Sequence, residues 1–193
     1  MRRRRRKPRI FAFIDSQNLN VSTQNLGWKM DWRKFREFLE QKYGVSEAFM
    51  FIGYIPENED MYEQLHDSGY KVVLKPTFDM TRPRPDVEKS DTKEKSDEDK
   101  KPTKGNIDAD LVLWAMKELK NYDKAIIVSG DGDFYALVEY LEGQGKLLKL
   151  LAPSGHYSSL YNAYDKYVDR IDQHRRELAY FDRRKRKSQT RGN

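Results

Sequence analysis

Ile126-Ile127-Val128-Ser129-Gly130-Asp131-Gly132-Asp133-Phe134 is a stretch in which an apolar run leads into two acids two residues apart. The β-branched run, bounded by glycine, predicts a short buried strand. Gly130 and Gly132 allow a tight exit turn and a close approach of the backbone to another group. Asp131 and Asp133 would then follow the carboxyl end of a strand, where open α/β sheets bind ligands. Crowded carboxylates repel one another unless a cation or a proton lies between them, so the stretch is a first indication of a divalent-metal site. A strand-to-helix turn with an acidic cap is the alternative.

A further acid follows the first predicted strand. The apolar run Ile10–Ile14 leads directly into Asp15, and Asn18 comes three residues later. Asn18 could help to hold a metal-bound water or orient Asp15. The alternative is that Asp15 caps a helix, with Asn18 in the turn.

A pair of acids opens a predicted helix that runs to about Leu119. Asp108 and Asp110 lie in its first turn, where negative charge suits the positive end of the helix dipole. That dipole and capping role is the alternative to a ligand role. Residues two positions apart on a helix do not face the same way, so only one of the two can point at a common site.

The remaining pattern alternates strands with helices. Further strands are predicted near residues 48–54, 71–75 and 146–151, and helices over residues 32–43, 56–68, 134–141 and 160–171. Five strands alternating with helices predict an α/β fold, with a central, mainly parallel five-stranded sheet and helices on both faces. Right-handed crossovers place all strand carboxyl ends at one edge, and a helix that covers the sheet runs antiparallel to the strands. The acids can therefore converge on one cleft.

The composition excludes several classes of site. No Cys is present, which rules out disulfides and thiolate zinc sites and favours a reducing compartment, for which we expect the cytoplasm. The three histidines are scattered, at His66, His156 and His174. No apolar run approaches the roughly 20 residues of a membrane span, and the basic N-terminus lacks the apolar segment of a signal peptide. No membrane association is therefore expected.

The charge distribution divides the chain into three parts. Residues 1–9 carry a charge of +7 and residues 175–193 carry +6, so subtracting both from the net +6 leaves −7 on residues 10–174. We expect a disordered basic arm, one domain over residues 10–174 and a basic C-terminal tail. A charged insert at residues 79–104 interrupts the domain, and we expect it to be disordered or to form a mobile loop. Basic ends favour a polyanion such as nucleic acid, with a solubilising role as the alternative.

The candidate site is rich in oxygen ligands and poor in other catalytic groups. Neither a Ser-His-Asp or Cys-His set nor a phosphate-binding glycine loop accompanies the acids. Four carboxylates can hold one or two Mg²⁺ or Mn²⁺ ions, which prefer oxygen ligands. Such ions activate a water and stabilise the charge that develops during phosphoryl displacement.

Three motifs together resemble a known family. They are Phe13-Ile14-Asp15-Ser16-Gln17-Asn18-Leu19, Lys104-Gly105-Asn106-Ile107-Asp108-Ala109-Asp110-Leu111 and Val128-Ser129-Gly130-Asp131-Gly132-Asp133-Phe134. In this order they resemble the NYN domain, in its LabA-like branch within the PIN-like nuclease superfamily, over about residues 10–170. The resemblance implies a three-layer α/β/α sandwich and a metal-dependent ribonuclease. It also implies a catalytic site of Asp15, Asn18, Asp108, Asp131 and Asp133, whose four carboxylates bind Mg²⁺ or Mn²⁺, with Ser129 and Asp110 as further candidates.

The chain departs from the family pattern in two places. Tyr164 stands between Ala163 and Asp165 where the family tends to have Ala-Asp, so Asp165 is given no site role. The insert at 79–104 is longer than expected between these motifs, and its effect on access to the site is open.

The leading hypothesis is an endoribonuclease that uses a metal-activated water on single-stranded RNA. A non-catalytic RNA-binding or scaffold protein of the same fold is the alternative, and a small-molecule phosphatase is a third reading that leaves the basic ends without a role. RNA rather than DNA follows from the resemblance alone. The oligomeric state is open, with a homodimer as one option. Residues expected to contact RNA are Lys104, Arg2, Arg3, Arg4, Arg5, Arg6, Arg183, Arg184, Lys185 and Arg186.

Overall fold

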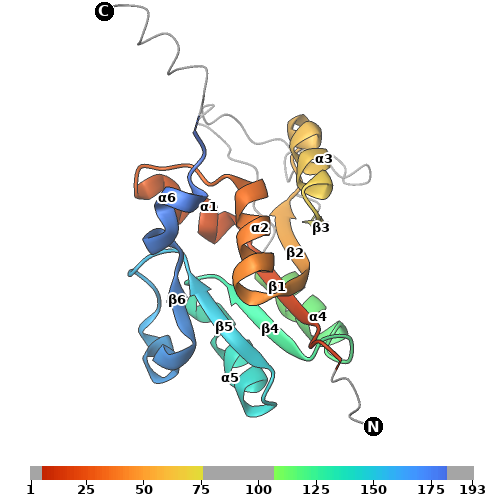
Figure 1. The fold of residues 1–193 in the computed structure, drawn as a ribbon, viewed down its shortest axis with the longest axis vertical. Helices are drawn as coiled ribbons and strands as arrows, with labels where there is room; N and C mark the ends of the chain where they lie inside the picture. The colour runs from red at the N-terminus through yellow and green to blue at the C-terminus, as the bar shows by residue number, and fades with distance from the viewer. Residues whose placement is uncertain (1–5, 76–106, 182–193) are drawn as a thin grey trace, which may run out of the picture.

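A six-stranded parallel sheet forms the centre of the protein (Figure 1). The computed structural model describes residues 6–75 and 107–181, so the predicted insert at 79–104 lies outside the described residues. The strand order is β3-β2-β1-β4-β5-β6, one strand more than the sequence pattern predicts. The strands are β1 (Ile10–Asp15), β2 (Val45–Gly53), β3 (Tyr70–Lys75), β4 (Lys124–Val128), β5 (Leu147–Ala152) and β6 (Val168–Arg170).

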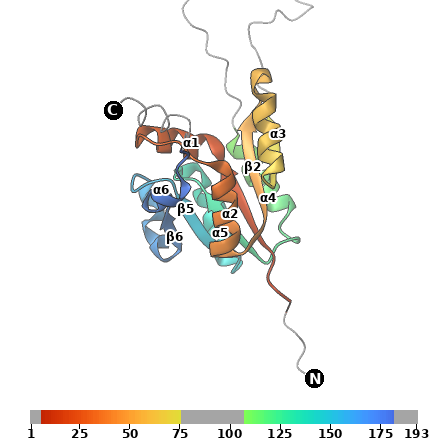
Figure 2. The same ribbon diagram turned by 45° about the horizontal axis from the view of Figure 1, so that its top comes forward.

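Helices cover both faces of the sheet, which confirms the predicted α/β/α sandwich (Figure 2). One face carries α1, α2, α3 and α6, and the other carries α4 and α5. Within the part of the chain that the structure describes, no helix has the length and apolar character needed to cross a membrane. The α-helices are α1 (Ser16–Asn25), α2 (Trp32–Tyr43), α3 (Glu59–Asp67), α4 (Asp108–Lys117), α5 (Tyr135–Gly143) and α6 (Arg175–Leu178); the 3-10 helices are η1 (Pro56–Asn58), η2 (Gly132–Phe134), η3 (Ser159–Tyr167) and η4 (Ile171–His174).

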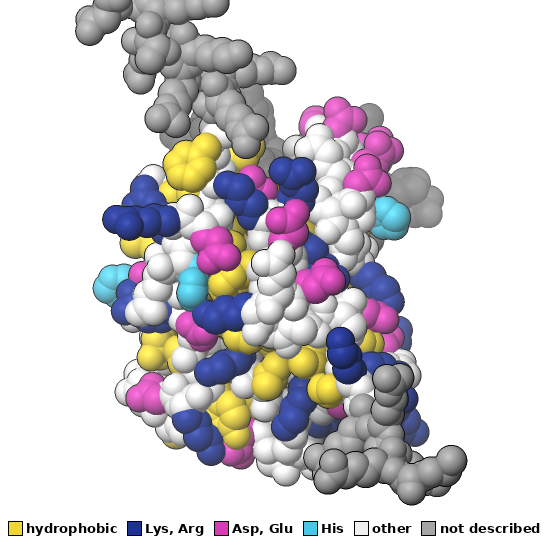
Figure 3. Space-filling view, viewed as in Figure 1, with side chains coloured by type: hydrophobic (Ala, Val, Ile, Leu, Met, Phe, Trp, Pro, Cys, Tyr) yellow, Lys and Arg dark blue, Asp and Glu magenta, His cyan; other side chains and the backbone are white. Residues whose placement is uncertain are grey.

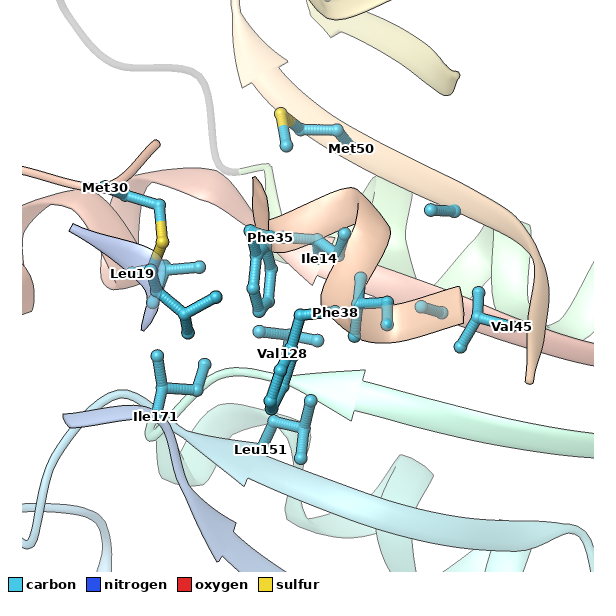
Figure 4. Packing of buried hydrophobic residues seen from close by; sticks show 14 of the residues in the cluster. Ile14, Leu19, Met30, Phe35, Phe38, Val45, Met50, Val128, Leu151 and Ile171 are labelled. Carbon is cyan, nitrogen blue, oxygen red and sulfur yellow. The ribbon is translucent and has the colours of Figure 1, made fainter. Parts of the chain in front are cut away.

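The central strands are apolar on both sides because helices bury both of their faces. In β1, Ile14 packs with α1 and α2, whereas Phe13 faces the α4 and α5 side. Figure 4 shows buried side chains on the α1 and α2 side of the sheet pointing toward one another, with Leu19 from α1, Phe35 from α2 and Ile14 from β1 among them. Strands of a parallel sheet that is covered on both faces therefore have continuous apolar sequences.

The predicted caps of α2 are present. Asp31 accepts a hydrogen bond from the backbone N–H of Lys34 at 3.2 Å, which satisfies a donor in the first turn. Gly44 ends the helix at a φ of 71°, a left-handed conformation that suits glycine. These local signals explain why the predicted span of residues 32–43 matches α2.

The C-terminal segment is the main correction to the predicted fold. A single helix was expected over residues 160–171, but the chain forms η3, β6, η4 and α6 instead. Tyr161 is buried on the α4 and α5 side of the sheet, whereas Ile171 is buried on the α1 and α2 side. The segment must pass around the edge of the sheet to reach both, and β6 pairs with β5 on the way, with Val168 opposite Leu150. One straight helix could not bury both residues.

The strand order reverses between β1 and β4. The chain runs outward from β1 to β2 and β3 on one side, and from β4 to β5 and β6 on the other. Such a reversal leaves a crevice at the strand carboxyl ends, where ligands bind in α/β sheets. Ile14 lies opposite Val128 in the register, so Asp15 and Ser129 are the next residues on these two neighbouring strands.

Candidate active site

Asp15 is the last residue of β1 and the N-cap of α1. Its Oδ1 accepts a hydrogen bond from the backbone N–H of Asn18 at 3.0 Å, and its side chain is only 5% exposed. The capping role considered from the sequence is therefore present. It leaves Oδ2 directed at the neighbouring strand end, so capping does not preclude a role in the site.

Ser129 and Asn18 join the two strand ends. The Ser129 hydroxyl donates to Asp15 Oδ2 at 3.2 Å and accepts from the backbone N–H of Asp131 at 3.1 Å. The Asn18 side-chain oxygen accepts from the backbone N–H of Gly130 at 3.0 Å. Asn18 thus holds the loop after β4 against the start of α1, and its contact to Asp15 is through its backbone. These bonds fix the position of Asp15 relative to Asp131.

Asp131 caps the short helix η2. Its Oδ1 accepts from the backbone N–H of Asp133 at 3.0 Å, so the second acid of the motif is held by the first. Asp131 is partly buried and Asp133 is exposed. Of the two acids, Asp131 is therefore the less exposed to solvent.

The segment at the start of η3 closes over the loop after β4, a contact that the sequence analysis missed. The Tyr161 hydroxyl donates to the Asp131 carbonyl, and the Ser158 backbone N–H donates to the Gly130 carbonyl at 3.0 Å. A Cβ on Gly132 would lie 2.5 Å from Ser158 Oγ. The glycines of the motif thus allow the predicted close approach, and this pattern was the one sequence signal for a neighbouring segment.

The two acids at the start of α4 have different surroundings. Asp110 forms an ion pair with Lys75, at 3.0 Å between Oδ2 and Nζ, at the end of β3. Burial raises the pKa of Asp108, and the charges of Asp15, Asp131 and Asp133 raise it further, while Lys75 lowers it. Asp108 therefore lies within electrostatic reach of the three other acids.

The pKa of Asp15 is raised as well. Burial raises its pKa, hydrogen bonds from Asn18 and Ser129 lower it, and the charge of Asp131 raises it again, with a net increase. Acids from three separate segments, β1, α4 and the loop after β4, thus gather at one edge of the sheet. The negative charges of the neighbouring acids make the charged forms of Asp15 and Asp108 less favourable.

The donor set suits a hard cation in its chemistry. The gathered groups are carboxylates with an adjacent amide and hydroxyl, which are the oxygen ligands that Mg²⁺ and Mn²⁺ prefer. In residues 6–75 and 107–181, however, no group of three or more His, Cys, Asp or Glu side chains is already arranged to hold a metal ion. The residue types fit a divalent cation, although the structure does not present them as a preformed ligand cage.

Of the basic residues predicted to bind RNA, Arg6 alone falls within the described residues, and it does not lie at this site. Arg6 lies near Asp123, whose pKa it lowers together with Arg9, and Arg9 hydrogen bonds Asp123 through the backbone at 2.7 Å. Asp123 immediately precedes β4, so Arg6 lies at the amino end of the sheet, opposite the acids. The other predicted contacts lie outside the described residues: Lys104, Arg2, Arg3, Arg4, Arg5, Arg183, Arg184, Lys185 and Arg186.

Comparisons with known proteins agree with this architecture. The chain is 24% identical over 172 residues to the low amplitude and bright protein LabA of Synechococcus elongatus, with 86% of each chain covered. A solved structure of a Vibrio parahaemolyticus protein of unknown function has the same fold, with a TM-score of 0.64 and 22% identity. That match covers 92% of this chain and 99% of the other.

One protein-family model matches most of the chain. The model of the NYN domain matches residues 9–172, which include β1, α4 and the loop after β4 with their acids. Members of this family are typically nucleases that act on RNA, and PIN-like nucleases generally use divalent metals. The match covers most of the sequence, and the chain belongs to the NYN domain family.

Proposed function

We propose that this protein is a metal-dependent endoribonuclease that cleaves RNA at the acidic edge of the sheet. The observation that carries the proposal is the gathering of Asp15, Asp108 and Asp131 at this edge, where the charge of Asp131 raises the pKa of both Asp15 and Asp108. These acids come from three separate segments and crowd negative charge that a divalent cation would neutralise. Membership of a family whose members are typically nucleases supports the same reading.

The residues that would hold the metal are Asp15, Asp108, Asp131 and Asp133. A bound Mg²⁺ or Mn²⁺ would supply an activated water and charge stabilisation for displacement at a phosphodiester. Mg²⁺ usually keeps several waters and takes only one or two protein carboxylates, so a preformed cage of three is not required.

The chain's own hydrogen bonds would orient these ligands. Ser129 holds Asp15 Oδ2 and the backbone of Asp131, while Tyr161 holds the Asp131 carbonyl. Partners of this kind around metal ligands fix carboxylate orientation, and their loss reduces metal affinity or activity. Asn18 acts on the position of the loop through Gly130.

A non-catalytic RNA-binding or scaffold protein is the second candidate. It is favoured by the lack, within the described ranges, of three acid or histidine side chains already placed around a metal. In this reading, the acids would serve as the caps of α1 and η2, which Asp15 and Asp131 do form.

The deciding experiment is a cleavage assay on labelled single-stranded RNA with Mn²⁺, with EDTA and with the variant Asp131→Asn. The Asn side chain can still accept the capping bond from Asp133, so η2 is retained while the negative charge is lost. We expect cleavage to fall at least roughly 100-fold in the variant and to stop in EDTA, since even indirect partners of metal ligands contribute 10- to 100-fold.

The matched control is Asp67→Asn, an exposed acid at the end of α3, which should cleave like the wild type. Cleavage that persists in EDTA or in Asp131→Asn would contradict the mechanism. RNA binding without cleavage in any of several divalent ions would favour the scaffold protein.

A further inference from the structure

Two aromatic side chains stand exposed at the end of the described chain. Tyr180 is 53% exposed and Phe181 is 65% exposed. Lys29 Nζ lies 5.6 Å from the centre of the Tyr180 ring, and Lys34 Nζ lies 5.2 Å from the centre of the Phe181 ring. We call these four residues the aromatic platform. Figure 3 shows hydrophobic side chains next to Lys and Arg side chains at the upper end of the described surface.

The backbone under the platform is held to the body of the protein. Tyr180 donates its backbone N–H to the Lys29 carbonyl at 2.8 Å, and Ala179 forms an antiparallel bridge with Met30. Lys34 Nζ donates to the Ala179 carbonyl at 3.0 Å. Leu178 and Ala179 are buried, so the chain is fixed immediately before the two rings. A backbone fixed in this way before binding reduces the conformational entropy that the segment loses when the rings bind a ligand.

The surroundings of the rings are positively charged. Residues 26–34 and 175–181 together have a net charge of +3, from five basic residues against two acids. Among them, Arg175 reaches the loop after α1, where its guanidinium donates to the Gly27 carbonyl at 3.1 Å. A partner with negative charge and flat apolar groups would complement both features of this surface.

The aromatic platform lies at the same edge of the sheet as the acids. Helix α2 covers the sheet antiparallel to the strands, so its start at Asp31 lies toward the strand carboxyl ends. Asp31 is hydrogen bonded to Leu178 at 2.9 Å, two residues before the first ring. Helix α1 begins directly after its N-cap Asp15 and spans ten residues, about 15 Å, before the loop that carries Lys29. One extended strand several nucleotides long could reach both places.

We propose that the aromatic platform is a second binding surface, on which unpaired bases of a single-stranded nucleic acid stack on Tyr180 and Phe181. The lysines beside the rings would contact the adjoining phosphates. Its role in guiding RNA to the acids rests on the proposed function, whereas its ability to bind does not. Stacking on aromatic side chains beside a basic surface is tolerant of sequence, because every base has a π-face.

Two other occupants match this surface less well. A second copy of the chain seated symmetrically on the same surface would oppose like charges across the contact. A membrane surface is matched less well, because the rings follow the four-residue helix α6, whose last residue Leu178 is already buried in the protein together with Ala179, and do not lie on a longer amphipathic helix.

The test compares two labelled strands in EDTA, so that binding is measured without cleavage. One is a short oligouridylate and the other is an abasic strand of the same length and charge. In the full chain, the double variant Tyr180→Ala/Phe181→Ala should bind the oligouridylate roughly tenfold or more weakly by fluorescence anisotropy. Its affinity for the abasic strand should be unchanged, because the phosphate contacts remain.

Two further variants control for folding and for loss of any exposed ring. Tyr180→Phe/Phe181→Tyr keeps both rings and should bind the oligouridylate like the wild type. Tyr140→Ala removes a ring that is 41% exposed on α5, on the other side of the sheet, and should also bind like the wild type. Unchanged affinity in the double alanine variant, or an equal loss on both strands, would overturn the proposal.

The other occupants are separate outcomes. Loss of phosphatidylserine vesicle binding in the double alanine variant, with oligouridylate affinity intact, would overturn the proposal in favour of a membrane. Dissociation of a dimer in that variant, again with oligouridylate affinity intact, would overturn it in favour of a second copy. Absence of cleavage with Mn²⁺, together with ring-dependent binding, would reject the endoribonuclease and leave the aromatic platform standing.

Discussion

Ser129 lies fully buried between the two central strand ends and hydrogen bonds in both directions. Its hydroxyl donates to Asp15 Oδ2 at 3.2 Å and accepts from the Asp131 backbone at 3.1 Å. A hydroxyl can do both at once, whereas a methyl group can do neither. The position therefore links the two acids on which the proposed chemistry depends.

Replacing Ser129 by Ala should destabilise the protein. The change leaves a buried carboxylate oxygen and a partly buried N–H without this partner, for which we expect a loss of about 1–3 kcal/mol in the free energy of unfolding. Urea denaturation measures it, with the exposed Ser159→Ala as the matched control. A Ser129→Ala protein as stable as the control would show that the hydroxyl is not needed to hold the two strand ends.

Between elements, the packing of the loop after β4 against the start of η3 depends on glycine. A Cβ on Gly132 would lie 2.5 Å from Ser158 Oγ, 3.1 Å from Ser158 Cβ and 3.2 Å from Leu160 Cδ1. Turning the Ser158 hydroxyl away would relieve only the first contact and would break the cap that it gives Leu160. The two segments can approach this closely only because position 132 has no side chain.

The variant Gly132→Ala should therefore separate the two segments. We expect it to lower the free energy of unfolding by about 1–3 kcal/mol through overpacking. Gly143→Ala is the matched control, because a Cβ on Gly143 meets nothing within 4 Å and its helical position should tolerate or slightly favour alanine. Equal stability of the two variants in urea denaturation would contradict this account of the loop packing.

For the molecule as a whole, Asp169 ties the edge strand β6 to helix α2. Its carboxylate accepts hydrogen bonds from Lys42 at 3.0 Å and from the Tyr43 hydroxyl, across more than 120 residues of sequence. Burial raises the pKa of Asp169, but the bonds from Tyr43 and Lys42, together with the charges of Lys42 and His174, lower it by more, so the pKa lies below its ordinary value. The charged form of Asp169 is thus favoured in the folded state.

At acidic pH, the free energy of unfolding of the whole molecule should depend on the charge of the Asp169 carboxylate. A depressed folded-state pKa contributes stability above the unfolded pKa of about 4, and that contribution is lost as the pH falls through the folded pKa. The wild type should therefore be more stable than Asp169→Asn at pH 5, with the difference shrinking as the pH falls to about 2. The measurement is the urea midpoint of both proteins over this pH range.

The control for this pH series is Asp165→Asn, whose exposed side chain lies in the neighbouring η3. It should follow the wild type at every pH. A difference between wild type and Asp169→Asn that stays constant from pH 5 to 2 would refute the role of the charge.

Much of the architecture is readable from local patterns. The apolar runs of β1 and β4, the cap and terminal glycine of α2, and the acids after each strand are properties of short segments, so periodicity and capping chemistry predict them. The rule that parallel strands end at one edge then predicts that Asp15 and Asp131 lie near each other. For the same reason, the family motifs could be recognised without a structure.

Contacts between distant segments needed the folded chain. The Tyr161 bond to Asp131, the pairing of Asp110 with Lys75, and the position of Arg6 at the opposite end of the sheet follow from how segments pass one another in space. The segment from Tyr161 to Ile171 has helical apolar spacing, yet its helical part ends at Tyr167 and the edge strand β6 follows, because the segment must reach both faces of the sheet. Local spacing reports which residues are apolar, whereas packing against remote surfaces determines which face each of them buries.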